Sequence, residues 1–284
     1  MLKILRIEQW SKNLVIFLPA IFANKFTLII DEKLMLVFLG FSLIASSTYI
    51  FNDIKDVDQD KEHPIKKFRP LAKGDISIQN AKIYSLSLYF IGFGIVYFTS
   101  KYATIFLILY TLITVLYSNF FKYKKYLDFL AITVLFGVRL FLGSYLTGIV
   151  LTNALSFFIL STINQIIVSK KISIINNYDI DPNVKVKKYL LHNYRNKELN
   201  KIFNLSLILS LTILFFWSIQ WFDGGVFQVF VSILNFSSLC FFNYIFYGDT
   251  YRSETEDFIY WIKNSKMFFP MIISGLAVIT LLYL

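Results

Sequence analysis

Cysteine is nearly absent from this chain of 284 residues, in which Cys240 stands alone. A lone cysteine excludes an intrachain disulfide and a metal site built from several thiolates. Charge is scarce as well: 16% of the residues are charged, whereas 56% are hydrophobic and the mean hydropathy is +0.60. This composition indicates an integral membrane protein. Because no Gly/Ser-rich linker or low-complexity tract interrupts it, we expect one polytopic membrane domain over residues 1–284.

Apolar stretches of transmembrane length recur along the chain. A helix crosses the hydrocarbon core of a bilayer in about 20 residues. The first ten residues contain no small-residue cleavage site, so we expect insertion to depend on the first span itself. The pattern predicts an all-α integral membrane protein with nine transmembrane helices. These lie near 13–30, 34–53, 77–99, 102–121, 127–149, 153–170, 201–221, 225–247 and 267–284.

Basic residues are distributed unevenly between the predicted loops. A net charge of +10 would favour a nucleic-acid partner in a soluble protein, but most of the 28 Lys and Arg residues lie at the N-terminus and in the loops after even-numbered spans. The exceptions are Lys25, Lys33, Lys82, Lys101 and Arg139. The positive-inside rule therefore predicts a multi-pass protein of the plasma membrane, with no nucleic-acid partner. Its N-terminus and these loops would lie in the cytoplasm, and its C-terminus outside.

The densest acidic sequence, NDIKDVDQD at 52–60, directly follows an apolar span. If the helix continues through it at 100° per residue, four side chains share one narrow face, whereas Asp58 lies on the opposite side. The four are Asn52, Asp53, Asp56 and Asp60. Neighbouring like charges repel, so this acidic stripe favours a site for a hard divalent cation such as Mg²⁺, which shares oxygen ligands with phosphates. A solvated acidic loop that pairs with the following lysines is the alternative.

A cluster of fixed cations follows the acidic stripe. The string HPIKKFRP at 63–70 contains Lys66, Lys67 and Arg69. Carboxylates followed by such cations are typical of a diphosphate site, where arginine binds outer oxygens as a planar fork and lysine as a point charge. His63 could be a ligand or general base, or a structural hydrogen-bonding group. We expect the two long polar loops, at about 54–76 and 170–200, to form a cap over the site.

The spacing of the stripe resembles the NDxxDxxxD motif of the UbiA superfamily of intramembrane prenyltransferases, position by position. The resemblance implies nine transmembrane helices around a central cavity, the number that the apolar stretches predict independently. It also implies a magnesium-dependent membrane transferase. In that enzyme Asp53, Asp56 and Asp60 would be the catalytic metal ligands, with Asn52 as a further candidate.

Other strings resemble the decaprenyl-phosphate phosphoribosyltransferase branch of the superfamily. RIEQWSKN at 6–13 resembles RPxQWxKN, with Ile7 in place of proline, and HPIKKFRPLAKG at 63–74 resembles HPxKxxRPxAxG. YSNFFK at 117–122 resembles YSxxLK, and in the fifth span Leu127-Asp128 and Val138-Arg139 resemble the branch's LD and LR positions. The substrate-binding residues implied are Lys12, Asn13, Asn52, Lys66, Lys67, Arg69, Tyr117, Lys122, Asp128, Arg139, Lys170, Lys171 and Tyr194.

The loop after the sixth predicted span differs from that of aromatic prenyltransferases in the superfamily, which have a second DxxxD motif there. This loop has only Asp179 and Asp181, and a pair two residues apart points to different faces of a helix. SKK at 169–171 stands where the phosphoribosyltransferase branch has GKR, although Ile174 replaces an acidic residue of the branch. A basic wall in place of a second acidic stripe favours an anionic phosphate substrate.

Three further charges lie near or inside the predicted fifth span. Arg139 and Asp128 fall on one face of that helix, about 16 Å apart. A charge inside the bilayer is costly and by default functional. Arg139 could hold a phosphate, or it could pair with a carboxylate on a neighbouring helix. Lys122 and Asp128 could bind a sugar hydroxyl or a phosphate, or be simple interfacial charges.

The predicted function is Mg²⁺-dependent transfer of 5-phosphoribose from phosphoribosyl diphosphate to a polyprenyl phosphate that enters from the membrane lipid. Diphosphate is released, and the resemblance implies a role in cell-wall biosynthesis. One alternative is prenyl transfer from a prenyl diphosphate to an aromatic acceptor, as in quinone or haem O synthesis. A remote alternative is an ion-coupled transporter, which predicts charges distributed across the membrane depth. An oligomer is compatible with the sequence.

Overall fold

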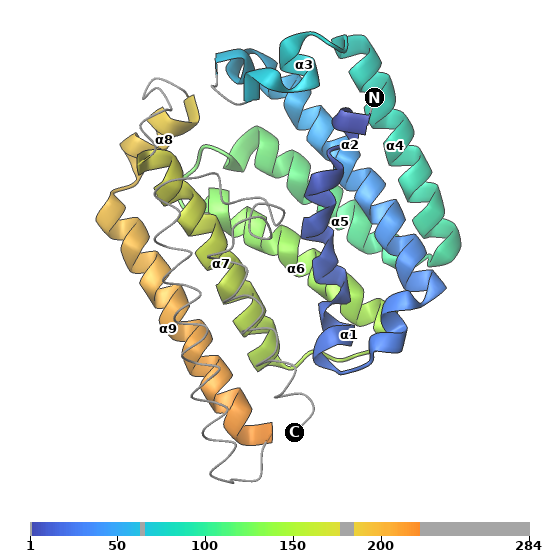
Figure 1. Cartoon of the computed structure of the whole chain (residues 1–284), viewed down its shortest axis with the longest axis vertical. Coiled ribbons are helices and arrows are strands. Elements are labelled where there is room, and N and C mark those ends of the chain that lie inside the picture. Colours follow the sequence, from blue (N-terminus) through green and yellow to red (C-terminus); the bar gives the residue numbers. More distant parts are fainter. Residues whose placement is uncertain (1, 63–65, 177–184, 222–284) are drawn as a thin grey trace. The chain divides into compact units, whose positions relative to one another are not determined.

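The computed structural model describes residues 2–62, 66–176 and 185–221, and the regular structure in these ranges is entirely helical (Figure 1). The chain divides into two compact units. The first comprises residues 1–150 and 178–189, and the second residues 151–177 and 190–284. The predicted spans near 225–247 and 267–284 lie outside the described residues. Nine spans and a single domain therefore stay predictions.

Five helices of the described part are long and apolar enough to cross a membrane. They include α2 (Glu32–Glu62), α4 (Ile78–Thr99) and α6 (Leu127–Thr147) of the first unit. The fourth joins α5 (Ala103–Leu116) to a π-helical turn, η5 (Tyr117–Phe121), and the fifth is α7 (Asn153–Asn176) of the second unit. These five helices confirm the prediction of a multi-pass helical membrane protein.

Helix α2 is longer than a bilayer requires. Its 31 residues extend over about 46 Å at 1.5 Å per residue, whereas the hydrocarbon core is about 30 Å thick. Neither glycine nor proline interrupts its last part, residues 52–62, which contains the acidic stripe. The helix therefore continues through the stripe, as the argument from helical phase required.

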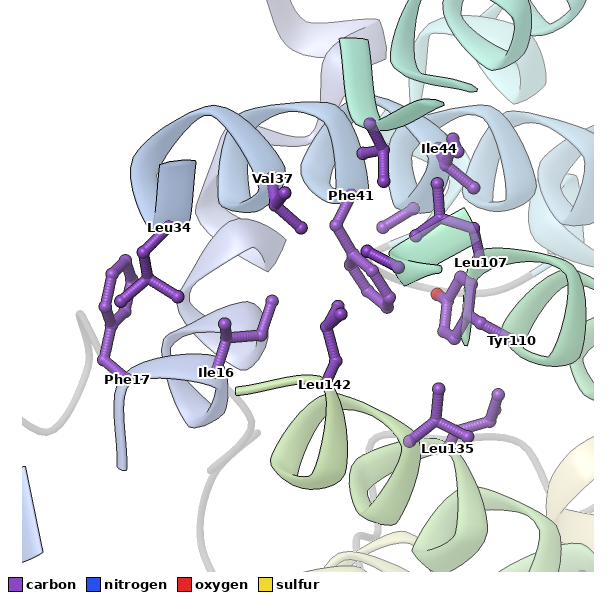
Figure 2. Close-up of a cluster of buried hydrophobic side chains, with 14 residues drawn as sticks. Ile16, Phe17, Leu34, Val37, Phe41, Ile44, Leu107, Tyr110, Leu135 and Leu142 are labelled. Atoms are coloured by element: carbon purple, nitrogen blue, oxygen red, sulfur yellow. The ribbon is translucent and has the colours of Figure 1, made fainter. Parts of the chain in front are cut away.

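Apolar side chains from α2, α5, α6 and the N-terminal segment form the core of the first unit (Figure 2). The rings of Phe41 and Tyr110 pack there with centroids 4.7 Å apart. On another side of α2, α4 packs closely where Gly40 of α2 meets Gly92 of α4. A Cβ atom at Gly92 would lie 2.5 Å from the carbonyl oxygen of Gly40, and small residues of this kind let membrane helices approach closely.

The N-terminal segment is helical but not a continuous α-helix. Residues Leu2–Leu5 and Ile7–Phe17 form the 3₁₀ helices η1 and η2, followed by α1 (Leu18–Phe22) and by η3 (Phe26–Ile30). Pro19 lacks a backbone N–H, and Asn24 has a positive φ of 55°, so α-helical hydrogen bonding cannot run through the segment. The predicted span near 13–30 is thus built from short pieces.

Short elements connect the long helices. In the first unit they are η4 (Lys66–Phe68) and α3 (Pro70–Lys73), which follow the acidic end of α2. Helix α8 (Lys185–Asn193) begins in the first unit and ends in the second. In the second unit, α7 packs against α9 (Asn196–Trp221), where the Gln165 side chain donates to Ser210 Oγ at 2.9 Å.

Candidate functional site

The acidic stripe lies on one face of α2, as its spacing predicts. Asp53 and Asp60 are 8% and 4% exposed, although both are carboxylates. Asp58 points away: its side chain is 90% exposed and pairs with Lys61, one turn along the same helix, at 3.1 Å. The predicted separation of Asp58 from the stripe is therefore seen in the structure.

Two arginines neutralise the buried carboxylates. Arg69 Nη1 donates to Asp60 Oδ2 at 2.7 Å and to Asp53 Oδ1 at 3.1 Å. Arg6 Nη1 approaches the same Asp53 oxygen at 3.3 Å. Arg69 comes from the turn before α3, and Arg6 comes from the N-terminal segment. Segments far apart in sequence thus place their charges on the same end of α2.

The π-helical turn η5 supplies the third cation. Lys122, directly after the turn, pairs with Asp56, and Ser118 Oγ donates to Asn52 Oδ1 at 2.5 Å. Both pairs are spaced by four residues, so Asn52 and Asp56 on α2 face Ser118 and Lys122 in register. Single π-helical turns are frequent at functional sites, and this one aims two polar side chains at the stripe.

The basic string after α2 contributes a second layer of charge. Lys66 is partly buried, and burial, together with the nearby Arg69 guanidinium, lowers the pKa of Lys66 below its ordinary value. Lys67 is exposed. Tyr123, the residue after Lys122, donates from its hydroxyl to Gln59 Oε1 of α2 at 3.1 Å. Burial and the charges of Asp56 and Asp60 raise the pKa of Tyr123 to about 12, so it stays a neutral donor.

The chemistry of the stripe fits a hard divalent cation. Its side chains offer only oxygen ligands, the kind that Mg²⁺ takes in proteins. Asp53 and Asp60 already converge on one cationic atom, the Nη1 of Arg69. In the part of the chain that the structure describes, no three acidic, His or Cys side chains form a preformed cluster for a metal ion. The carboxylates are therefore arranged around arginine and lysine nitrogens.

Asp128 lies near the stripe's partners at the start of α6. Its side chain is 3% exposed; Oδ1 accepts the backbone N–H of Phe129 at 2.8 Å, and Oδ2 accepts the Tyr189 hydroxyl at 3.4 Å. A carboxylate in the first turn of a helix is stabilised by the helix dipole. Tyr117, the first residue of η5, is partly buried.

Arg139 is buried in the core, 3% exposed. Its Nε donates to Asn13 Oδ1 at 2.8 Å, Nη1 to the Leu135 carbonyl at 2.7 Å and Nη2 to the Tyr110 hydroxyl at 3.3 Å. Among the described residues it forms no ion pair with a carboxylate. Asn13 is fully buried beside it, whereas Lys12, the preceding residue, is partly exposed. The predicted residues Asn13 and Arg139 thus bind each other.

The remaining predicted site residues belong to the second unit. Lys171 is 7% exposed, and its Nζ lies 4.6 Å from the centre of the Tyr194 ring. Lys170 is exposed. Lys171 and Tyr194, each predicted to bind substrate, thus form a cation–π contact, an interaction worth about 0.5–2 kcal/mol. His63, Asp179 and Asp181 lie outside the described residues.

Arg6 and Ser118 contact the stripe but are missing from the residues predicted to bind substrate. Both lie inside strings that carry the resemblance, RIEQWSKN and YSNFFK. The signal for Arg6 was its place at the start of the first string. Its role could not be recognised from spacing, because Arg6 lies 47 residues from Asp53 in the chain.

Comparisons with known proteins identify the family. A profile described as the UbiA prenyltransferase family matches residues 13–270. The decaprenyl-phosphate phosphoribosyltransferase of Mycobacterium tuberculosis is 39% identical over 77 residues, 25% of this chain and 26% of that protein. The digeranylgeranylglyceryl phosphate synthase of Saccharolobus solfataricus is 27% identical over 143 residues, 48% of this chain and 50% of that protein. The chain thus spans half or less of the length of these curated relatives.

A solved structure extends the comparison to the whole chain. The UbiA homolog from Archaeoglobus fulgidus, bound to GPP and Mg²⁺, has a TM-score of 0.65 and 17% sequence identity, and the match covers 100% of this chain and 99% of that one. At this identity the similarity shows the fold. The two proteins therefore share a fold.

Proposed function

This chain belongs to the UbiA prenyltransferase family, and on that premise we propose that it transfers 5-phosphoribose from phosphoribosyl diphosphate to a polyprenyl phosphate. As a member of that family it is a membrane transferase. The observation that carries the proposal is the end of α2, where three carboxylates of one stripe face Arg6, Arg69 and Lys122. A relative that bears the phosphoribosyltransferase name supports the donor.

Three carboxylates and three cations balance in charge at the stripe. A diphosphate is negatively charged, and the Mg²⁺ bound with it would supply the positive charge that the carboxylates need. Mg²⁺ at Asp53, Asp56 and Asp60 would neutralise the diphosphate and stabilise it as a leaving group. Arg69, Arg6 and Lys122 would then pair with phosphate oxygens in place of carboxylate oxygens, since guanidinium and ammonium groups both form charge-assisted hydrogen bonds to either kind of oxygen.

The reaction requires little covalent chemistry from the protein. The bond between the anomeric carbon and the diphosphate oxygen breaks, and its electron pair leaves with the diphosphate. An oxygen of the polyprenyl phosphate forms the new bond to the anomeric carbon. This oxygen is already anionic, so no base has to remove a proton. The side chains of the site hold the two phosphorylated substrates and stabilise the departing charge.

The donor's 5-phosphate needs cations of its own. Lys66 and Lys67, which directly precede Arg69, are the candidates in the first unit, and Lys170 and Lys171 are those of the second. Lys12 and the polar groups of Tyr117, Asp128 and Tyr194 complete the proposed substrate contacts. The positive-inside pattern supports a location in the plasma membrane with this end of α2 in the cytoplasm, where phosphorylated sugars are available.

Prenyl transfer from a prenyl diphosphate is the second candidate. The name of the relative from Saccharolobus solfataricus and the GPP bound to the neighbour from Archaeoglobus fulgidus favour it. The same stripe would then hold the diphosphate of a prenyl donor. The basic string SKK at 169–171, in place of a second acidic motif, favours the phosphoribosyl donor.

An assay with two labelled donors separates the candidates. Purified protein receives either phosphoribosyl diphosphate labelled in the ribose together with polyprenyl phosphate, or labelled prenyl diphosphate together with aromatic or glyceryl phosphate acceptors. We expect Mg²⁺-dependent ribose label in the lipid extract. Transfer of prenyl label alone, with all ribose label in the aqueous phase, would establish the second candidate instead.

A further inference from the structure

Arg139 is a buried charge that the proposed mechanism does not use. It lies in α6, one of the helices long enough to cross a membrane. Its guanidinium carbon, Cζ, lies 4.7–5.3 Å from the ring centroids of Phe41, Tyr110 and Phe136. A charge is costly to bury in a membrane and requires a compensating role. The contacts of Arg139 connect it to the N-terminal segment, and that segment reaches the acidic stripe.

Residues 5–13, which we call the N-terminal strap, lie along one face of α2. Asn13 Nδ2 donates to Ser42 Oγ at 3.0 Å, and Trp10 Nε1 donates to Ser46 Oγ at 2.9 Å. Ser46 in turn donates to the backbone carbonyl of Leu5 at 2.6 Å. Ser42 and Ser46 are one turn apart, so the strap is bound at successive turns of α2.

The same face of α2 ends in the acidic stripe. Arg6 lies 5.5 Å from the centre of the Tyr49 ring and contacts Asp53. At 100° per residue, positions 42, 46, 49 and 53 all fall within about 60° of one another. The strap therefore runs from the buried Asn13 to the stripe along a single line of α2.

The 3₁₀ form of the strap matches the length that it has to cover. From Ser42 to Asp53, α2 rises about 16 Å. The seven steps from Asn13 to Arg6 cover about 14 Å in a 3₁₀ helix, at about 2.0 Å per residue, but only about 10 Å in an α-helix. The longer 3₁₀ rise brings the Arg6 backbone nearer to Asp53, and the Arg6 side chain spans the remaining distance. The register of the strap thus depends on where Asn13 is held.

Both sides of Asn13 are held. Arg139 donates to its side-chain oxygen while Ser42 accepts from its side-chain nitrogen. Three residues further along, Gly143 of α6 lies against the strap's continuation: a Cβ atom there would be 2.0 Å from the Ile16 carbonyl oxygen. At the other end Arg6 has a left-handed backbone, with φ 51° and ψ 49°. Such a conformation persists only where surrounding contacts enforce it.

We propose that Arg139 is a positioning residue, which acts through Asn13 and the N-terminal strap to hold Arg6 against Asp53. The buried guanidinium fixes the amide of Asn13, and the amide fixes the register of the strap on Ser42. Arg6 then arrives at the diphosphate end of the site. This proposal gives Asn13 and Arg139 an indirect role in donor binding, in place of the direct substrate contact that the sequence predicts. The proposal rests on the proposed function in one respect, namely that phosphoribosyl diphosphate is the substrate whose binding is affected.

The register of the strap can be measured without any substrate. Cys240 is replaced by serine, and a single cysteine carrying a nitroxide label is placed at Ile7, which is 44% exposed on the strap, or at Ile83, which is 54% exposed on α4. We expect Arg139→Lys and Asn13→Ala to increase label mobility at position 7 and not at position 83. Unchanged mobility at position 7 would overturn the proposal.

Two serines of α2 provide a matched pair of milder variants. Ser42 and Ser47 are both buried and hydrogen-bonded, but Ser42 binds the strap, whereas Ser47 shares a 3.1 Å contact with Ser85 of α4. Ser42→Ala should mobilise the label at position 7, and Ser47→Ala should not. Equal effects of the two would show general loosening of α2 and contradict the proposal. This pair keeps the test decisive if Arg139→Lys fails to fold.

Donor kinetics provide the functional test. Arg139→Lys, which keeps the charge but not the forked contacts, should raise KM for phosphoribosyl diphosphate about tenfold and leave KM for polyprenyl phosphate unchanged. In an Arg6→Ala background, Arg139→Lys should cause no further rise, because its effect passes through Arg6. Additive effects of the two substitutions would refute the relay. If wild-type protein transfers no ribose, the proposed function fails, while the label measurement still decides the role of Arg139.

Discussion

The first unit holds charge in two contrasting ways. At the end of α2, carboxylates face arginine and lysine at a partly exposed surface, where the Asp56 and Arg69 side chains are 24% and 25% exposed. In the core, Arg139 is 3% exposed and is held by an amide, a carbonyl, a hydroxyl and aromatic rings. The first arrangement consists of opposite charges, and the second of one charge among neutral groups.

The difference bears on what each region can do. A side-chain cation that pairs with a carboxylate can bind a phosphate oxygen instead, if a metal ion replaces the cation at the carboxylate. Arg139 has no charged partner among the described residues to exchange, and its removal would take a donor from the buried side-chain oxygen of Asn13. The stripe is therefore suited to binding a charged ligand, and Arg139 to fixing structure.

The sharpest test of the contrast removes one carboxylate charge without changing its shape. Asp53→Asn should lower kcat/KM by more than about 100-fold. In metal sites, substitution of residues that only hydrogen-bond to the metal ligands already costs about 10–100-fold in metal affinity or activity. The matched control is Asp58→Asn, because Asp58 lies on the opposite face of α2 and pairs with Lys61. Steady-state transfer assays with both variants check this. Near-normal activity of Asp53→Asn would refute a metal-binding stripe.

A smaller effect is expected from the cation that bridges two carboxylates. Arg69→Gln removes charge-assisted hydrogen bonds worth about 1.5–3 kcal/mol, so KM for the diphosphate donor should rise about 10- to 150-fold. Lys61→Gln is the control, since Lys61 is exposed and pairs with Asp58 on the opposite face of α2. Isothermal titration with Mg²⁺ and pyrophosphate measures binding without turnover. Equal losses in both variants would indicate nonspecific electrostatics.

For Arg139 the contrast predicts a loss of stability. Arg139→Met leaves the buried Asn13 oxygen without this donor, and a buried group left unsatisfied costs about 1–3 kcal/mol. Thermal unfolding in detergent should show a lower Tm than for Lys82→Met, which removes an exposed charge of α4. A variant with unchanged Tm but no transfer activity would contradict a structural role and favour a direct phosphate contact.

The smallest predicted effect concerns pH. Because burial lowers the pKa of Lys66 below 10.5, the lysine loses its positive charge at a lower pH than an ordinary lysine. Donor binding should weaken as the pH rises through that lowered pKa, which gives kcat/KM of the free enzyme an alkaline limb. Lys66→Arg stays charged and should remove the limb, while Lys67→Arg should leave it. An identical limb in all three proteins would exclude Lys66 as its source.

Much of the stripe could be predicted from sequence because its parts lie on one helix. Helical phase alone separates Asp53, Asp56 and Asp60 from Asp58. The existence of the long spans was equally predictable, since each is an uninterrupted apolar stretch. Local periodicity is sufficient for such features, because both the element and its face are encoded within a few turns.

Contacts between distant segments could not be predicted in this way. The pairing of Arg6 with Asp53 requires the strap to lie along α2, where Ser42 and Ser46 bind it. The sequence also left two roles open for Arg139, a phosphate ligand or a carboxylate partner. Among the described residues Arg139 has no carboxylate partner, because an asparagine side chain from the strap takes that position.

The central claim is that the stripe of α2 binds the diphosphate of a phosphoribosyl donor through a divalent ion. A structure determined with Mn²⁺ in place of Mg²⁺, polyprenyl phosphate and a non-hydrolysable phosphoribosyl diphosphate analogue tests it directly. The account predicts anomalous density within about 2–2.5 Å of carboxylate oxygens of the stripe, with a ribose 5-phosphate beside Arg69. Metal density away from Asp53, Asp56 and Asp60, or no sugar phosphate beside the stripe, would contradict it.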